Sequence, residues 1–412
     1  MLNIKKIVTI IILFSFILLQ FNILSNFSAS SNQEQSFVKY TLYLNNNTLF
    51  PGNENFNKSV QYSIQPSGMA YCLSNGDLYV LGISPSKLFV INAETDKITK
   101  VISLPPNSEP WSIVYKPNGN LMYIMNNGYT LVLNCSTDEI NGQINNTGIG
   151  YGQMLFNEQN NCLYISSMYA LTVLNTENNS IITHINLPDG DSYIAYNPNN
   201  KEIYIPNSGE MFYPNGSYQI WHNVTVISTK NNKILGSINV GEKPFGILYD
   251  PINNYIYVGN EFSKNITIIN GNSNIVIGNI NLPYNPYALT LDPLNNYIYV
   301  INTVIFDNGS ESGLFNGKVT VINGNYNKII NSFNVGINPI SIIYAPNNYI
   351  YVSNTFSGTA LGTSGTISVI TTSNITNNSG IQLFNFIWVI IIIFVIIAIP
   401  LIIIFFKKSK IK

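Results

Sequence analysis

The sequence predicts an all-β protein, and three observations support this class. A strand-like phrase recurs as DPINNYIYVGN from Asp250, DPLNNYIYVIN from Asp292 and, one residue shorter, APNNYIYVSN from Ala345. The runs around these phrases are short and rich in Ile, Val and Tyr, and Pro, Gly and Asn separate them as expected for hairpin turns. Apolar residues at the three-to-four spacing of an amphipathic helix do not occur there. The repeating unit is therefore made of strands.

Alignment on the second Tyr of the phrase defines seven copies, here called the first to seventh repeats. The aligned residues are Tyr79, Tyr123, Tyr164, Tyr204, Tyr257, Tyr299 and Tyr351. Their spacings are 44, 41, 40, 53, 42 and 52 residues, which suits a unit of four strands. The copy that begins at Pro244 contains four such runs, FGILYD, NYIYVGN, NITIING and IVIGNINL.

The second strand of each repeat is apolar on both of its faces, as in Tyr255, Ile256, Tyr257 and Val258. A sheet wetted on one side would alternate, so both faces must be covered. Four-stranded sheets arranged radially meet this demand, because each sheet packs between two neighbours. A parallel β-helix or a sandwich could also bury such strands, but neither suits a four-stranded unit of this length. We therefore expect residues 58–373 to form a seven-bladed β-propeller.

The last repeat lacks its fourth strand, because only SNITNNSG follows Thr372 before the next apolar segment. Residues 58–64, KSVQYSI, precede the first repeat where a fourth strand would stand. We predict that this N-terminal strand completes the last blade. Residues 37–44, FVKYTLYL, also have strand character, and the sequence does not place them.

The phrase DPxNNYIYVxN, followed by ITIING or VTVING and a strand that ends in NVG, resembles the YVTN-type β-propeller repeats of surface-layer-like proteins. The resemblance covers about residues 60–373; it is strong from Pro244 to Thr371 and weak in the first three repeats. It implies a propeller in a membrane-anchored envelope protein, and we expect an archaeal one. Because the motif describes turns and packing, it implies little about chemistry.

The two ends of the chain read as targeting and anchoring segments. Residues 1–30 place Lys5 and Lys6 before an apolar run of about 13 residues and then small residues, which predicts a signal peptide, with an uncleaved anchor as the alternative. Residues 387–406 form an uncharged run long enough for a transmembrane helix. The lysine-rich tail, residues 407–412, is predicted to be cytoplasmic. Residues 31–57 form an N-terminal segment, residues 374–386 a linker, and the ectodomain lies outside the cell.

Composition excludes some partners. Charged residues make up 9 % of the chain and the formal net charge is −1, so no basic surface is available for nucleic acid. The expected partners are the membrane, through the C-terminal helix, and other envelope proteins or glycans. Cys72, Cys135 and Cys162 have no metal-binding spacing and read as buried apolar residues. A bridge between Cys135 and Cys162, which belong to neighbouring repeats, stays open.

The chain offers little for catalysis. It has two histidines, His184 in an outer strand and His222 in an insertion, so a histidine-rich metal centre is excluded and no cofactor is predicted. Asp250 and Asp292 resemble a carboxylate pair in an alignment, but they belong to equivalent turns of different repeats and are expected to cap those turns.

Three repeats carry insertions between their second and third strands. These are SGEMFYPNGSYQIWHN from Ser208, VIFDNGSESGLFNG from Val304 and FSGTALGTSG from Phe356. In an up-and-down blade all three emerge on one face, and long loops on a rigid scaffold are where binding concentrates. The candidate binding residues are Phe212, Tyr213, Tyr218, Trp221, His222, Phe306 and Phe315, and the candidate N-glycosylation sites are Asn215, Asn223, Asn265 and Asn308.

The function expected from the sequence is that of a non-enzymatic structural or interaction protein at the cell surface. One alternative is a receptor or adhesin that binds a glycan, peptide or solute through the insertions of the fourth, sixth and seventh repeats. A second alternative is a propeller-type surface hydrolase or oxidoreductase with polar residues lining a central channel.

Overall fold

The computed structural model describes residues 38–44, 65–83, 86–106, 108–188, 192–212, 218–303, 316–356 and 365–372, all of which belong to one compact unit. The predicted signal peptide, the linker, the transmembrane segment and the tail lie outside these residues. Among the described residues, no helix has the length and apolar character that a membrane crossing requires.

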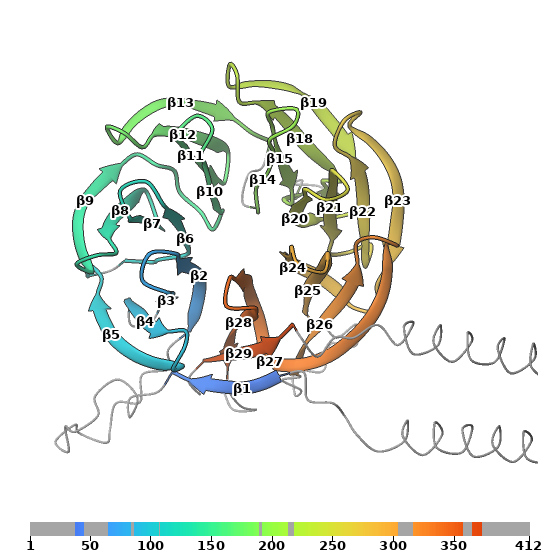
Figure 1. Ribbon diagram of the computed structural model, residues 1–412. Coiled ribbons are helices and arrows are strands. Elements are labelled where there is room, and N and C mark those ends of the chain that lie inside the picture. Colours follow the sequence, from blue (N-terminus) through green and yellow to red (C-terminus); the bar gives the residue numbers. More distant parts are fainter. Residues whose placement is uncertain are drawn as a thin grey trace, which may run out of the picture. The chain divides into compact units, whose positions relative to one another are not determined.

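The described chain is all-β, and its first five repeats each form a four-stranded antiparallel sheet (Figure 1). The innermost strands are β2 (Pro66–Cys72), β6 (Ser112–Lys116), β10 (Met154–Asn157), β14 (Ala195–Asn197) and β20 (Pro244–Asp250). The second strands are β3 (Asp77–Gly82), β7 (Leu121–Asn126), β11 (Cys162–Ser167), β15 (Glu202–Asn207) and β21 (Tyr255–Asn260). The third strands are β4 (Lys87–Asn92), β8 (Tyr129–Asn134), β12 (Ala170–Asn175), β18 (Asn223–Ser228) and β22 (Asn265–Asn270). The outermost strands are β5 (Lys97–Ser103), β9 (Glu139–Asn145), β13 (Ser180–Asn186), β19 (Lys233–Asn239) and β23 (Ile275–Asn281).

The sixth and seventh repeats share one seven-stranded sheet. Its strands are β24 (Asn285–Asp292), β25 (Tyr297–Thr303), β26 (Asn316–Asn323), β27 (Lys328–Ala345), β28 (Tyr349–Phe356), β29 (Thr366–Thr371) and β1 (Val38–Tyr43). The two repeats merge because β27 is 18 residues long. Its first half pairs with β26 as a fourth strand, and its second half pairs with β28 as an innermost strand.

The strand that completes the last repeat is not the predicted one. β1 pairs with β29 from Val38 opposite Ile370 to Tyr43 opposite Thr366. Since β28 occupies the other edge of β29, the prediction that residues 58–64 fill this place is wrong; those residues lie outside the described part. The physical reason is apolar complementarity, because β1 is followed by Leu44, which is fully buried in the cluster shared by the first and last repeats.

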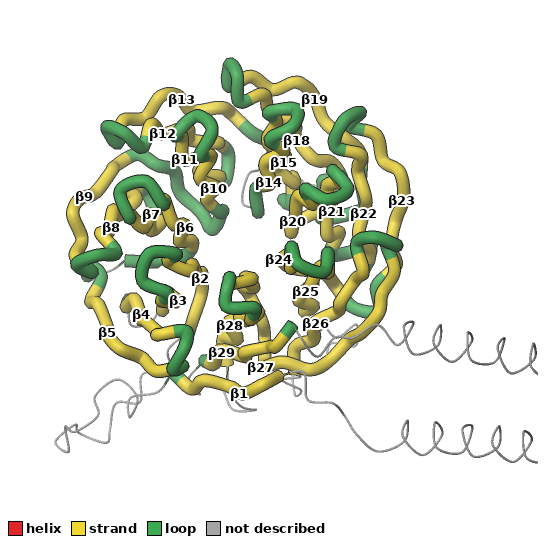
Figure 2. The backbone as a smooth tube through the Cα atoms, viewed as in Figure 1, coloured by secondary structure: helices red, strands yellow, loops and turns green. Residues whose placement is uncertain are grey.

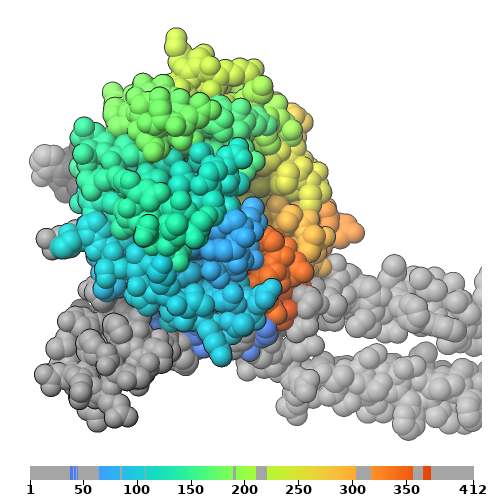
Figure 3. All heavy atoms as spheres, turned by 60° about the vertical axis from the view of Figure 1, so that its left-hand side comes forward, coloured from blue at the N-terminus to red at the C-terminus, as the bar shows by residue number. Residues whose placement is uncertain are grey.

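The hydrophobic core is divided into clusters that lie between neighbouring repeats. Ile256, Tyr257 and Val258 of β21 are fully buried although they point to opposite faces, which confirms the expected two-sided burial. One cluster joins the first repeat to the seventh through Phe89, Met69 and Tyr351. The first and seventh repeats, coloured blue and orange-red, lie against each other in Figure 3. The innermost strands also contact in chain order, and β27 contacts β2, so the series of sheets closes on itself.

The seven aligned tyrosines are the largest fully buried side chains of the described residues. Four of their hydroxyls donate short hydrogen bonds to the turn between the third and fourth strands of the next repeat: Tyr79 to Asp138 at 2.6 Å, Tyr123 to Asn179 at 2.8 Å, Tyr204 to Asn274 at 2.6 Å and Tyr257 to Asn327 at 2.6 Å. The accepting residues all have positive φ, near 55°. Asn and Asp tolerate this conformation and offer a side-chain acceptor, so one residue shapes the turn and ties two sheets together.

This network supports a paired prediction. Tyr257→Phe should lower the free energy of unfolding by about 1–2 kcal/mol, because it leaves the Asn327 acceptor without its buried donor. Tyr299 is the matched control, since its buried hydroxyl has no hydrogen-bond partner among the described residues, and Tyr299→Phe should change stability by less than about 0.5 kcal/mol. Chemical denaturation of both variants measures the difference. Equal losses would contradict the assigned role of the hydroxyl.

The remaining parts of the repeated phrase also serve turns and packing. The Asp250 carboxylate accepts hydrogen bonds from the backbone NH of Ile252 at 2.8 Å and of Asn253 at 3.3 Å. Asp292 accepts from the NH of Leu294 at 3.0 Å. Both aspartates are therefore turn caps, as expected. Asn260, which ends the second strand of the fifth repeat, packs against Gly241, which precedes the same repeat. A Cβ on Gly241 would lie 2.7 Å from the Asn260 side chain.

Candidate binding face

The sheets present two different ends, which we call the turn face and the loop face. Turns after first and third strands lie on the turn face, whereas links between second and third strands and links to the next repeat lie on the loop face. Figure 2 shows the described loops in green. Each insertion joins a second to a third strand, so all three begin and end on the loop face. In the fourth repeat, β16 (Glu210–Phe212) and β17 (Tyr218–Ile220) pair as a small hairpin of their own.

Trp221 and His222 sit at the base of this hairpin and are tied to the link that leads into the fifth repeat. The Trp221 carbonyl accepts a hydrogen bond from the backbone NH of Lys243 at 3.1 Å, and the His222 carbonyl accepts one from the NH of Val240 at 2.8 Å. Trp221 is half-buried and His222 is exposed. The insertion is therefore anchored at its base to the neighbouring sheet.

The other predicted site residues are placed only in part. Phe212 and Tyr218 lie opposite each other in the β16–β17 pair. Tyr213, Asn215, Phe306, Asn308 and Phe315 lie outside the described residues. The two described sequon residues share a local arrangement. Asn223 and Asn265 each accept a hydrogen bond from the Asn that ends the second strand of the same repeat, Asn207 and Asn260 respectively.

A set of aromatic residues that sequence reasoning missed lies at the loop-face ends of the innermost strands. The ring centroids of Phe245 and Tyr287 are 4.6 Å apart, and those of Tyr193 and Phe245 are 5.8 Å apart. Tyr193 donates to the carbonyl of Ile340 in the seventh repeat at 3.2 Å. Phe245 and Tyr287 each follow a proline within the first two residues of an innermost strand, and this recurrent Pro-aromatic pair was a usable signal. We call Tyr193, Phe245 and Tyr287 the axial aromatic set.

The axial aromatic set offers three uncharged rings, two of which carry a phenol hydroxyl. Burial raises the pKa of Tyr193 and Tyr287 well above the ordinary value, so both phenols keep their protons. Charge is sparse around them: Lys243 pairs with Glu261 at 3.3 Å and lies over the Phe262 ring at 4.5 Å. Half-buried aromatic rings with a few polar groups suit contacts with sugar rings or protein side chains.

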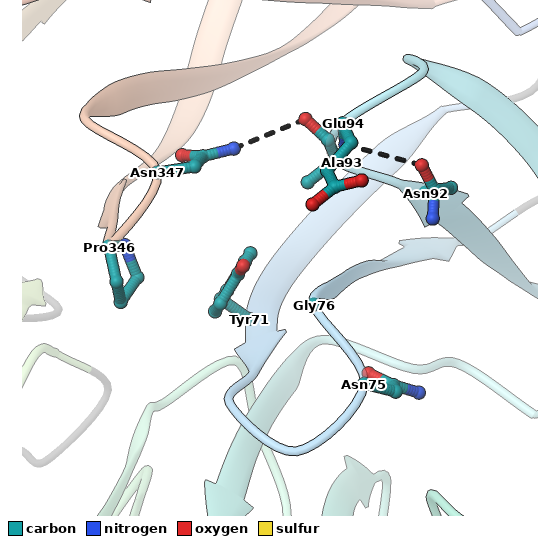
Figure 4. A pocket seen from close by; sticks show the side chains of 8 residues that line it. All are labelled: Tyr71, Asn75, Gly76, Asn92, Ala93, Glu94, Pro346 and Asn347. Atoms are coloured by element: carbon teal, nitrogen blue, oxygen red, sulfur yellow. Dashed lines mark hydrogen bonds between the residues drawn. The ribbon is translucent and has the colours of Figure 1, made fainter.

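A pocket of about 290 Å³ opens on the turn face between the first and seventh repeats (Figure 4). Tyr71, Glu94 and Asn347 line it, and the Asn347 amide donates to the Ala93 carbonyl at 3.3 Å. Burial raises the pKa of Tyr71, and the carboxylates of Asp77 and Glu94 raise it further. The pocket lies beside the APNN turn, which is one residue shorter than the DPINN and DPLNN turns. Within the described ranges no three His, Cys, Asp or Glu residues gather as metal ligands.

Comparison with known proteins bears on the fold. The hydrazine synthase of Kuenenia stuttgartiensis, a β-propeller-containing protein, is similar with a TM-score of 0.57 at 16 % identity, over 77 % of this chain and 99 % of that one. The chain has a β-propeller-like fold. At this identity the likeness concerns architecture alone, and since 1619 chains of solved structures match, one neighbour's activity carries no weight here. No family model and no curated protein sequence matches the chain.

Proposed function

We propose that the chain is a membrane-anchored, seven-bladed β-propeller of the YVTN type that acts outside the cell as a non-enzymatic structural or interaction protein. The seven buried tyrosines, one per repeat, support the blade count. The length of β27, which serves two repeats, explains why two blades share a sheet. The pairing of β1 with β29 supports closure of the last blade by the N-terminal strand.

One observation carries the functional part of this proposal. Val38 lies opposite Ile370, and β29 ends at Thr371, so the chain enters and leaves the described unit at the same end of the same sheet, on the turn face. Anchors that precede residue 38 or follow residue 372 would then attach at the turn face. The loop face, with the three insertions and the axial aromatic set, would point away from the membrane toward other molecules.

An epitope-accessibility experiment tests the topology. One epitope is inserted between Ser312 and Gly313, in the insertion of the sixth repeat, and another is added after Lys412. Antibody should label the first epitope on intact cells, and the second only after the membrane is permeabilised. Labelling of the C-terminal epitope on intact cells, or of neither epitope until permeabilisation, would refute the proposed orientation.

The receptor or adhesin function is a second candidate, and the axial aromatic set on the insertion face favours it. Substituting Trp221 and Tyr213 together by Ala should reduce binding to envelope glycans or to neighbouring cells at least about tenfold, because aromatic anchors dominate such contacts. Tyr326→Ala is the matched control, since Tyr326 is 70 % exposed in a turn on the opposite face. Binding is measured alongside the circular dichroism spectrum. Unchanged binding by the folded double variant would favour a purely structural role.

A further inference from the structure

The three cysteines occupy two different interfaces between repeats. Cys72 ends β2, and Cys135 directly follows β8; both belong to the cluster between the first and second repeats and are 0 % and 3 % exposed. Cys162 belongs to the cluster between the third and fourth repeats. The pairing of Cys135 with Cys162 that the sequence left open is therefore not what the fold favours. The Cys135 side chain points toward the first repeat. The position of Cys135 in the sequence does not determine this direction.

Asn120 of the second repeat forms hydrogen bonds with both cysteines. The Cys72 thiol donates to the Asn120 side-chain oxygen at 3.5 Å, while the Asn120 carbonyl accepts a hydrogen bond from the backbone NH of Cys135 at 2.9 Å. Asn120 has a φ of 55°, so the turn that presents it is itself tightly specified. Ser74 adds a 3.2 Å contact to the Cys72 sulfur and donates to the same Asn120 oxygen at 2.7 Å. Asn120 thus contacts both cysteines, and both of their side chains belong to the same buried cluster between the two repeats.

The thiols also interact with each other. A hydrogen bond from Cys135 lowers the pKa of Cys72, and the same interaction, together with burial, raises the pKa of Cys135. Hydrogen bonding from the Ser74 hydroxyl, 3.2 Å from the sulfur, and from backbone NH groups of the turn also lowers the pKa of Cys72, so Cys72 is the cysteine of the pair that is favoured to ionise. A thiolate is the attacking species in disulfide exchange, so the pair contains a nucleophile and a resolving thiol.

We propose that Cys72 and Cys135 form a disulfide that joins the first and second repeats. With a low-molecular-weight disulfide as oxidant, the Cys72 thiolate attacks one sulfur, the oxidant's S–S bond breaks and one thiol leaves. Cys135 then loses its proton and attacks the Cys72 sulfur of the mixed disulfide, and the second thiol leaves. The protein loses two electrons and two protons, which convert one oxidant disulfide to two thiols.

The position of Cys72 gives the oxidant a route. The sulfur lies beneath the turn of residues 73–76, whose Leu73 is 59 % exposed and whose Ser74 touches the sulfur. Opening this single turn exposes Cys72 without separating the two sheets, and local openings of surface turns require much less free energy than global unfolding. The bond would close a loop of residues 73–134, which restricts the unfolded chain.

Peptide mapping of the full-length protein tests the proposal. The purified protein is equilibrated with oxidised glutathione, remaining thiols are alkylated, and peptides are identified by mass spectrometry. We expect a peptide pair joined through Cys72 and Cys135, lighter by two hydrogens than the reduced pair, with Cys162 alkylated. Oxidation should raise the Tm of the protein by roughly 5 °C.

Two variants sharpen the test. Cys162→Ala should keep both the cross-linked peptide and the redox-dependent rise in Tm, whereas Cys135→Ala should lose both and accumulate a glutathione adduct on Cys72. The mapping of the parent protein does not depend on whether these variants fold. Full alkylation of Cys72 and Cys135 after oxidation, a persistent glutathione adduct on Cys72 of the parent, or a bridge to Cys162 would overturn the proposal.

Discussion

Deletion of residues 38–44 is expected to abolish cooperative unfolding of the described unit. The deletion removes β1 and exposes the edge of β29, the third strand of the last repeat. It also removes Leu44, which is fully buried among residues of the first and last repeats. Loss of that side chain alone, as in Leu44→Ala, should cost about 2–5 kcal/mol. Thermal unfolding followed by calorimetry and by circular dichroism measures both effects.

The control for this prediction is the segment that the sequence first suggested. Replacing residues 58–64 by a Gly-Ser linker of equal length keeps the connection to β2 and should leave the unfolding transition sharp. Should the linker variant lose cooperativity while the deletion of residues 38–44 melts as sharply as the parent, the assignment of β1 as the completing strand would be wrong.

Gly246→Ala should destabilise the protein by about 3 kcal/mol, because overpacking at a rigid contact displaces backbone. Gly246 lies in β20, and a Cβ there would be 2.3 Å from the Tyr287 carbonyl oxygen and 2.7 Å from a Leu289 methyl group. The carbonyl belongs to the neighbouring innermost strand and cannot turn away as a side-chain end could. The substitution would therefore push the fifth and sixth repeats apart.

Gly278→Ala is the matched control in the outermost strand of the same sheet. No atom lies within 4 Å of the Cβ that this substitution would add. Alanine loses less conformational freedom than glycine in a strand, so the change should be neutral or stabilising by up to about 1 kcal/mol. Urea denaturation of the two variants compares them directly. A Gly246→Ala variant as stable as the parent would show that the innermost strands are not in tight contact.

The strands and turns were predictable because their causes are local. The two-sided apolar run of Tyr255 to Val258 implied that both faces of the strand are covered, and Ile256, Tyr257 and Val258 are fully buried. The Asp250 turn followed from the ability of Asp to cap the next backbone NH groups, and the structure has these bonds. Each of these properties depends on a residue and its near neighbours in the chain.

The parts that sequence reasoning missed depend on pairings across long separations. Val38 pairs with Ile370 although nearly the whole described chain lies between them. From the sequence, residues 37–44 and residues 58–64 both had the strand character needed to pair at this edge of the last repeat. Cys135 faces Cys72 and not Cys162, because the choice depends on which neighbour its side chain points toward. Tyr193, Phe245 and Tyr287 come together only because three innermost strands begin near one another at the loop face.

By itself, the sequence determined the repeating unit, its all-β character and the positions where insertions interrupt it, because periodicity and turn chemistry are written in consecutive residues. Only the tertiary structure decided which strand completes the last repeat, which interface each cysteine enters and which aromatic rings meet. Those outcomes are set by packing between sheets, where several segments of similar propensity compete and shape complementarity selects one.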